Sequence, residues 1–568
     1  MKPLDPAKPL PTFVIEAANA EPTRVSDELP ALTVTEPRPG AYTFDLGKNM
    51  VGWVRLKVSG RAGQKIRVRH GEMLNPNGTL YTSNLRGANA VDTYALKGGG
   101  VEILEPPFTF HGFRYVEVTG LDSAPGVEAV TGVAVHSGMD RTGDFECSNP
   151  LVNQLFQNIV WSQKGNYVEV PTDCPQRDER AGWTGDAQFF MNTAAFNFDV
   201  AAFHTRWLTT LVQDSQLPAG SFAMVAPVFG TPWTSTAWGD AALVCTHAIY
   251  RIYGDTRIIE RNYEAMLRYM AWVGGQATDG VVTMRGIGDH LNLGGGAPVP
   301  VINTAYYAYL AGLMTEMAEA IGRPEEAARF RHLRETEKAA FQRAFVGTDG
   351  TIKDSSQTGY ALAFSMELLE ESQKPAVAEK FVEELRKRDW HLATGFVGTP
   401  RLLPALHLAG RDDVAYRVLL QETYPSWLAQ VKNGATTVWE RWDGWTPEKG
   451  FQTIAMNSFN HYAFGAVAEY LYRHVAGIDA AGPGFREIAI QPSPAEGLTW
   501  TRASYDSISG RIVSAWQIVD GEFRLQVEVP PNTEATVYVP ARAGAAVREG
   551  GRDAAGAEGV TFLRYADG

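Results

Sequence analysis

The spacing of apolar residues changes twice along this chain, and this change constrains the fold more than any other sequence feature. From about residue 43 to residue 135, apolar and polar residues alternate, which is typical of half-buried strands. From about residue 149 to residue 475, apolar residues recur at every third or fourth position, which is typical of amphipathic helices. From about residue 483 onward the alternation returns. The 568 residues exceed one compact core, so we expect a multidomain α and β protein with its helices between two β-rich domains.

The first zone predicts an antiparallel β-sandwich, with a leading segment, over residues 1–145. Val54, Leu56 and Val58 alternate with polar residues, and glycine-rich turns separate this run from the next. The third zone, residues 479–568, predicts a smaller C-terminal β-sandwich, because Phe523 and Leu525 begin a second alternating run after an Asp-Gly turn. The N-terminal sandwich could bind sugar or simply pack against a larger domain, and the sequence favours neither role.

The middle zone, residues 146–478, predicts a run of helices. Ile259, Tyr263, Met266 and Met270 follow the spacing of one apolar helix face. Twelve helices are expected, near residues 150–162, 187–198, 200–214, 239–252, 257–274, 303–321, 325–345, 357–370, 375–388, 400–409, 412–422 and 458–474. Twelve successive helices indicate a double-layered α/α barrel. A helical solenoid has the same local pattern, but no fixed-period repeat favours it.

Composition limits the binding partners and the cellular compartment that we expect. Hydrophobic residues make up 45% of the chain, which argues against extensive disorder. The net charge is −13 without a long basic tract, so neither nucleic acid nor a membrane surface is expected as a partner, and a neutral small molecule fits better. Cys147, Cys174 and Cys245 are too few and too far apart for a disulfide framework. The first residues lack the apolar stretch of a secretory signal, which is typical of a cytoplasmic protein, although a chain trimmed of its leader would look the same.

Residues 173–186 read Asp-Cys-Pro-Gln-Arg-Asp-Glu-Arg-Ala-Gly-Trp-Thr-Gly-Asp and form the first candidate site. They hold four carboxylates, two guanidinium groups and an indole. Pro175 and the two glycines disfavour a regular helix, so we expect an irregular loop that aims several charges at one point. Carboxylates beside a tryptophan are typical of carbohydrate chemistry, since acids move protons and an aromatic face holds a sugar. A solvated charged loop with one buried tryptophan is the alternative, which the turn residues and mixed charges weaken.

A second cluster, residues 436–445, reads Thr-Thr-Val-Trp-Glu-Arg-Trp-Asp-Gly-Trp. Three tryptophans surround two acids there, and aromatic rings stack on sugars while carboxylates bind their hydroxyl groups. Each tryptophan is explained at least as well by a place in the core. If Glu179 and Glu440 face each other, one acid protonates the leaving oxygen. The other then either activates water, with the pair roughly 6.5–9.5 Å apart, or attacks the sugar at about 5–5.5 Å.

Other chemistries lack their usual signals. The sequence contains no HExxH, GxSxG or GxxxxGK[ST] motif, which are the marks of zinc proteolysis, α/β-hydrolase acyl transfer and P-loop phosphoryl transfer. Cys174 has acidic neighbours that disfavour a thiolate, so we expect it to pack rather than act as a nucleophile. Trp238 with Asp240 and Asp289 with His290 are weaker candidates, and the first pair is better explained as a helix start.

Both clusters resemble the bacterial α-L-rhamnosidases of glycoside hydrolase family 78. The resemblance rests on residues 173–186 and on Gly-Ala-Thr-Thr-Val-Trp-Glu-Arg-Trp at residues 434–442, and it extends to residues 110–115, 238–241, 395–399, 424–427 and 457–461. It implies an (α/α)6-barrel catalytic domain flanked by antiparallel β-sandwich domains. It also implies an inverting hydrolysis of terminal α-L-rhamnose that needs no metal or cofactor. A homodimer is compatible with it.

The resemblance also assigns roles to single residues. Glu179 matches the general acid and Glu440 the general base that activates water. The residues expected to hold the rhamnose hydroxyls or enclose its ring are Asp173, Arg177, Trp183, Asp186, Trp238, Asp289, His290, Trp439, Trp442 and His461. The family usually has Asp-Trp-Leu where this chain has Asp-His-Leu at residues 289–291, so an imidazole replaces one aromatic wall.

Nearby charges affect the protonation that these roles require. A general acid must stay protonated near neutral pH, which burial or the negative charge of Asp173 and Asp186 would favour. Arg177 and Arg180 would oppose that effect unless they pair with the aspartates.

Two alternative functions remain open. One is another inverting glycosidase or a phosphorylase on the same barrel, and the other is a sugar-binding protein impaired in catalysis through His290. Because both candidate carboxylates are present, the binding protein ranks lowest.

Overall fold

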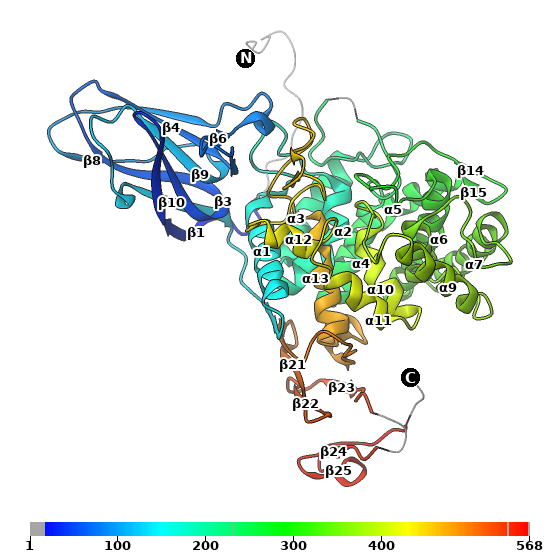
Figure 1. Ribbon diagram of the computed structural model, residues 1–568. Coiled ribbons are helices and arrows are strands. Elements are labelled where there is room, and N and C mark those ends of the chain that lie inside the picture. Colours follow the sequence, from blue (N-terminus) through cyan, green and yellow to red (C-terminus); the bar gives the residue numbers. More distant parts are fainter. Residues whose placement is uncertain (1–16, 231, 542–544, 566–568) are drawn as a thin grey trace.

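The computed structural model describes residues 17–230, 232–541 and 545–565, and it has three parts in chain order (Figure 1). Strands form the first part, helices the second, and strands again the smaller third part. The expected fold class, a helical domain between β-rich domains, is confirmed. The leading residues on which the cytoplasmic expectation depends lie outside the described residues.

The N-terminal domain is organised around one long strand, β3. Its strands are β1 (Thr23–Pro30), β2 (Thr33–Arg38), β3 (Ala41–Ser59), β4 (Lys65–Gly71), β5 (Met73–Leu74), β6 (Leu80–Tyr81), β7 (Val91–Ala95), β8 (Val101–Leu104), β9 (His111–Thr119) and β10 (Val130–Ser137). The first half of β3 pairs with β2 and β9, its second half pairs with β10 and β8, and β4 and β7 extend the sheet beyond β9. The domain encloses its own apolar core, which includes Phe44, Leu56 and Phe113.

Strands β1 and β2 precede the region in which alternation predicted strands. Most of their side chains are exposed or half-buried, so they lack the alternation of apolar and polar residues that identifies a half-buried strand. They are stabilised by pairing with β10 and β3 rather than by burial of their own side chains.

The middle domain contains the helices. They are α1 (Pro150–Asn166), α2 (Thr184–Asn197), α3 (Ala201–Thr209), α4 (Ala241–Tyr253), α5 (Arg257–Gly274), α6 (Val299–Ala320), α7 (Pro324–Phe345), α8 (Gln357–Ser365), α9 (Lys374–Arg386), α10 (Thr399–Leu408), α11 (Asp412–Leu419), α12 (Trp427–Lys432) and α13 (Val467–Tyr470). Short hairpins lie between them, formed by β12 (Tyr167–Val168) with β13 (Val170–Pro171), β14 (Ala277–Thr278) with β15 (Val281–Val282), and β16 (Trp445–Thr446) with β17 (Gly450–Phe451).

The predicted helices appear near their expected places, with three differences. The helix expected over residues 357–370 ends earlier, at Ser365 of α8. Helix α12 was not predicted, because six residues are too few to show a helical period; it begins where the Ser426 hydroxyl accepts a hydrogen bond from the Ala429 amide at 3.1 Å. The helix expected over residues 458–474 starts later, at the turn Ala463–Ala466 that leads into α13. Residues 457–462 instead form an irregular segment that contacts the second acidic cluster through the Ser458 amide.

The C-terminal domain contains a four-stranded sheet, a three-stranded sheet and the two-stranded hairpin of β24 (Arg548–Glu549) and β25 (Arg552–Asp553). Its other strands are β18 (Ile478–Ala480), β19 (Glu487–Ile490), β20 (Trp500–Ser507), β21 (Gly510–Val519), β22 (Glu522–Glu528) and β23 (Glu534–Val537). The four-stranded sheet begins with β11 (Gly143–Cys147), which pairs with β20. The segment that follows the N-terminal domain thus belongs to the C-terminal sheet, so residues 143–145 lie outside the N-terminal sandwich to which we had assigned them.

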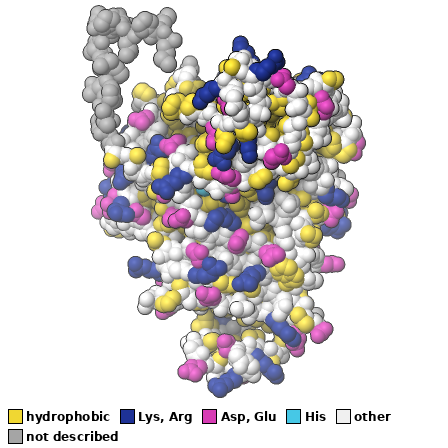
Figure 2. All heavy atoms as spheres, turned by 90° about the vertical axis from the view of Figure 1, so that its left-hand side faces the viewer, with side chains coloured by type: hydrophobic (Ala, Val, Ile, Leu, Met, Phe, Trp, Pro, Cys, Tyr) yellow, Lys and Arg dark blue, Asp and Glu magenta, His cyan; other side chains and the backbone are white. Residues whose placement is uncertain are grey.

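The surface agrees with the charge of the chain. On the face shown in Figure 2, acidic and basic side chains are interspersed over the domains instead of gathering by sign. Among the described residues, no helix has the length and apolar character needed to cross a membrane.

Candidate active site

The first acidic cluster is an irregular loop, as predicted, that runs into the buried helix α2. Its two ends are tied together at Asp173, whose amide donates to the Ala181 carbonyl at 3.0 Å and whose carboxylate accepts from the Ala181 amide at 2.8 Å. Arg180 has a positive φ of 44°, and its guanidinium donates to the Phe110 carbonyl of the N-terminal domain at 3.1 Å. The loop is therefore fixed both by itself and by the neighbouring domain.

Arg177 is the centre of the site. Its buried guanidinium forms a bidentate pair with Glu440, with N–O distances of 2.8 and 3.1 Å, although the two residues are 263 positions apart. The same group lies 2.9 Å from the Glu179 carboxylate and 3.7 Å from that of Asp173. The two acidic clusters thus meet at one positive charge.

Glu440 is buried, and its ionisation is controlled by Arg177. Burial alone would raise the pKa of this carboxyl, but the charge and hydrogen bonds of Arg177 outweigh it and hold the pKa below its usual range. The Ser458 amide adds a further hydrogen bond at 2.7 Å. Glu440 is therefore a carboxylate at neutral pH.

Glu179 lies nearer to solvent, with 16% of its side chain exposed. Besides Arg177, the Trp183 indole donates to it at 3.0 Å and Arg86 of the N-terminal domain at 2.9 Å. One Glu179 oxygen and one Glu440 oxygen lie 2.9 and 3.1 Å from the same Arg177 nitrogen, so these oxygens are no more than about 6 Å apart. The two carboxylates contact the same guanidinium group.

Asp173 and Cys174 line the buried side of the loop. Burial, together with the charge of Glu179, raises the pKa of Asp173 to about 7, and the Cys174 thiol donates to it at 2.8 Å. Burial also raises the pKa of the Cys174 thiol, which fits packing better than nucleophilic chemistry. Asp173, Cys174 and Glu179 are close enough to hold a cation, but the Arg177 guanidinium already places a positive charge beside both acids.

Asp186 and His461 form the other side of the site. Asp186 lies on α2, and its carboxylate is 3.2 Å from the His461 imidazole. Burial lowers the pKa of His461, but the hydrogen bond and charge of Asp186 outweigh it and raise that pKa above its usual range. The Phe396 ring centroid lies 5.2 Å from those of both His461 and His290, and the Trp238 and His290 rings are nearly perpendicular, with centroids 6.3 Å apart. These rings form a continuous row of contacts.

Three residues expected to bind substrate are placed differently. The Asp289 carboxylate accepts hydrogen bonds from the Thr358 hydroxyl and from the amides of Gly395, Val397 and Gly398, so it fixes the loop that carries Phe396. Its oxygens are already occupied by protein donors, and Asp289 positions the site rather than reaching a ligand.

Trp439 and Trp442 are packing residues. Trp439 is 2% exposed and packs edge-on against Phe459, in a small cluster that includes Tyr81 of the N-terminal domain. The Trp442 ring stacks on Phe464 at 4.1 Å, and its indole N–H donates to a carbonyl at 2.9 Å. Because protein covers their faces, both residues anchor the loop that carries Glu440 and present no face to a ligand.

The N-terminal domain supplies site residues that sequence reasoning missed. Besides Arg86, it contributes Glu72, which is buried and accepts hydrogen bonds from Asn49, Asn84 and the Phe459 amide. Burial raises the pKa of Glu72 to about 7. No pattern near Arg86 or Glu72 marks them, because their partners lie in another domain, hundreds of residues away in the case of Phe459.

Three family models match successive parts of this chain. Residues 140–475 match the model of the bacterial alpha-L-rhamnosidase 6 hairpin glycosidase domain. Residues 35–136 match the concanavalin-like domain of the same proteins, and residues 477–553 match their C-terminal domain.

The matches to individual relatives cover most of this chain. It is 47% identical to an alpha-L-rhamnosidase of Streptomyces avermitilis over 92% of its own length and 50% of the relative's, and 40% identical to one of Formosa agariphila over 88% and 55%. A crystal structure of the Streptomyces avermitilis alpha-L-rhamnosidase complexed with L-rhamnose superposes with a TM-score of 0.91 at 45% identity, over 95% of this chain and 53% of that one. The native Aspergillus terreus enzyme superposes with a TM-score of 0.88 at 35% identity, over 94% and 63%. The chain spans about half the length of the curated relatives it matches.

Proposed function

The chain belongs to the bacterial α-L-rhamnosidase family, and from this we propose that it hydrolyses terminal non-reducing α-L-rhamnose from rhamnosides or rhamnose-containing oligosaccharides. The observation that carries the proposal is the meeting of Glu179 and Glu440 at the buried guanidinium of Arg177. Glycoside hydrolysis requires two carboxyl groups with different environments, and this pair provides them.

We assign the general base to Glu440 and the general acid to Glu179. Glu440 is buried and its pKa is lowered, so it stays ionised and can accept a proton from water. Glu179 is partly exposed, which suits a group that must reach the glycosidic oxygen of an entering substrate. To donate a proton it must leave its contacts with Arg177 and Arg86, and this movement would also widen the gap to Glu440.

The separation of the carboxylates bears on the stereochemical course. The nearest pair of oxygens, no more than about 6 Å apart, is below the roughly 6.5–9.5 Å between carboxyl groups that leaves room for a water molecule. We propose inversion because Glu179, with 16% of its side chain exposed, can move toward solvent and widen this gap, whereas Glu440 is buried, with 2% of its side chain exposed.

The sugar itself would lie against the row of rings. Rhamnose has a methyl group where most hexoses have a hydroxymethyl group, so an apolar surface favours it. Trp238 and Phe396 provide such a surface, while Asp186, His461 and Asp173 offer polar atoms for the hydroxyl groups. His290 belongs to the same row, and burial lowers the pKa of its imidazole, so it acts as a neutral ring.

Hydrolysis of an aryl α-L-rhamnoside by the full chain and by Glu179→Gln and Glu440→Gln variants tests the proposal. Each variant should lose about 10²- to 10⁴-fold in kcat. The matched control is Glu337→Gln, which neutralises another buried glutamate on α7 and should keep the wild-type rate. Wild-type activity in either site variant would remove that residue from its role. Faster cleavage of another aryl glycoside would overturn the proposed substrate. Cleavage only in the presence of phosphate would overturn hydrolysis as the reaction.

A further inference from the structure

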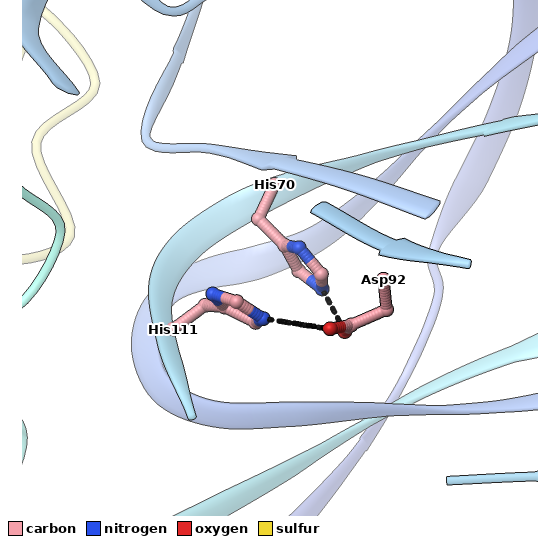
Figure 3. Close-up of side chains that lie close together, drawn as sticks. All are labelled: His70, Asp92 and His111. Atoms are coloured by element: carbon pink, nitrogen blue, oxygen red, sulfur yellow. Dashed lines mark hydrogen bonds and ion pairs between the residues drawn. The ribbon is translucent and has the colours of Figure 1, made fainter. Parts of the chain in front are cut away.

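A second group of ionisable side chains lies in the N-terminal domain, outside the proposed catalytic centre. His70 is on β4, Asp92 on the adjacent β7, and His111 at the start of β9, and Figure 3 shows both imidazoles directed at the aspartate. The three residues are too far apart in sequence to form a recognisable motif.

The spacing of their ligand atoms fits one metal ion. The His111 Nε2 atom lies 3.2 and 3.3 Å from the two Asp92 oxygens, and the His70 Nε2 atom lies 3.8 Å from one of them. The three ligand atoms are all within 4.8 Å of one another. Zinc bonds of about 2.0–2.2 Å in tetrahedral geometry place ligand atoms about 3.3 Å apart, so small side-chain shifts would close the site.

The hydrogen bonds of His70 prepare it as a ligand. Its Nδ1 atom lies 3.0 Å from the Ala90 carbonyl, which can only accept, so Nδ1 carries the proton and Nε2 has a free lone pair. A carbonyl on the far nitrogen is the usual way in which proteins orient a metal-binding histidine. His70 is 1% exposed, and its buried Nε2 has no hydrogen-bond partner among the described residues.

A purely structural hydrogen bond accounts for only part of this arrangement. A bond from His111 to Asp92 satisfies those two residues, but it leaves the buried Nε2 of His70 unpaired. It also leaves the two imidazoles stacked, with ring centroids 4.1 Å apart.

We propose that His70, Asp92 and His111 form a binding site for a divalent transition-metal ion of the zinc class. Two imidazole nitrogens and one carboxylate are borderline ligands that suit Zn²⁺ or Co²⁺ better than Ca²⁺ or Mg²⁺, which prefer all-oxygen sites. The site is separate from the carboxylates of the proposed hydrolysis, so it does not depend on that function.

A metal ion there would brace the domain interface. The residue after His111 is Gly112, which lies so close to the acidic loop that a Cβ atom would be 2.9 Å from Pro175. The preceding residue, Phe110, accepts a hydrogen bond from Arg180 at 3.1 Å, and its ring lies 4.7 Å from that guanidinium. Holding His111 therefore fixes the backbone against which the acidic loop rests.

Titration of the full chain with ZnCl2 after removal of bound metals by a chelator tests the site. Calorimetry should show one ion per chain and a rise in the thermal midpoint. Asp92→Asn should bind at least about 100-fold more weakly, beyond the 10- to 100-fold effect of losing an outer hydrogen-bond partner, and His70→Gln should lose saturable binding. His332→Gln, which replaces an exposed histidine on α7, should bind as wild type.

Cobalt identifies the ligands independently of the variants. Co²⁺ should give the visible absorption of a nitrogen- and oxygen-bound ion without a sulfur charge-transfer band. Such a band would place the ion on a cysteine and overturn the proposal, as would the absence of stoichiometric binding or equal binding by Asp92→Asn. If His70→Gln does not fold, as judged by circular dichroism, the shape-conserving Asp92→Asn variant and the wild-type cobalt spectrum still test whether these residues bind the ion.

Discussion

Replacing Arg177 by methionine should convert Glu440 from a carboxylate into a neutral acid. Methionine keeps much of the length of the side chain but removes the charge that lies within 3.7 Å of Asp173, Glu179 and Glu440. Burial, which the guanidinium now outweighs, would then determine the pKa of Glu440 and raise it. The proposed base would be protonated at neutral pH.

The magnitude follows from the burial of the pair. Both side chains are nearly inaccessible, at 1% and 2%, and removing one partner of such a pair costs about 3–5 kcal/mol. The wild-type carboxyl has a lowered pKa, so it contributes stability above the usual glutamate pKa, and this contribution is lost as pH falls through the folded pKa. In the variant the pKa is raised, so the folded state takes up the proton first. The stability gap between the two proteins should therefore be widest near pH 8 and narrow toward pH 4.

A pH–rate profile on an aryl α-L-rhamnoside measures the same change in activity. The variant should lose about 10²- to 10⁴-fold in kcat at neutral pH, and its acidic limb should move to higher pH because the base ionises later. Arg177→Lys keeps a charge but loses the bidentate contact, so its limb should lie between the two. A variant with the wild-type limb, whether or not its rate falls, would refute this role of Arg177.

Three further predictions test neighbouring features. Arg86→Ala removes a cation that Glu179 must leave before it protonates the glycosidic oxygen, so kcat/KM should rise by up to about fivefold, equivalent to about 1 kcal/mol, with little change in the thermal midpoint because the pair is partly exposed; a lowered kcat/KM would contradict it. Gly112→Ala places a Cβ atom 2.9 Å from Pro175 and should cost about 1–3 kcal/mol and lower kcat, measured by thermal melting and initial rates, whereas Gly556→Ala, with open space around it, should do neither. Burial raises the pKa of Glu337 to about 7, so the folded state binds its proton more tightly than the unfolded chain and stability falls as pH rises from about 5 to 7; Glu337→Gln should remove up to about 3 kcal/mol of that fall in melting curves, and an equal fall in both proteins would contradict it.

The fold was predictable where side-chain periodicity is strong. Helix α5 buries one regular face and was expected to the residue, over Arg257–Gly274. Strands β1 and β2 were not, because edge strands with exposed side chains are stabilised by backbone pairing that leaves no pattern. The place of β11 in the C-terminal sheet was also hidden, since its partner β20 lies more than 350 residues later.

The site was predictable where its residues are close in sequence. The run at residues 173–186 is dense enough in charge and turn residues to be recognised as an irregular loop. Trp439, Trp442 and Asp289 have the residue types of a sugar site, but only their neighbours in space show that they anchor loops. The sequence also could not show which carboxylate neutralises Arg177, because its partner Glu440 lies 263 residues away.

The anomeric form of the first product tests the central claim most directly. Proton NMR spectra recorded during hydrolysis of an aryl α-L-rhamnoside by the full chain should show β-L-rhamnose first, with the α form appearing later by mutarotation. That result requires rhamnose release and attack by water on the opposite face, as expected if Glu440 is the base. Initial release of α-L-rhamnose, or no release of rhamnose, would contradict the account.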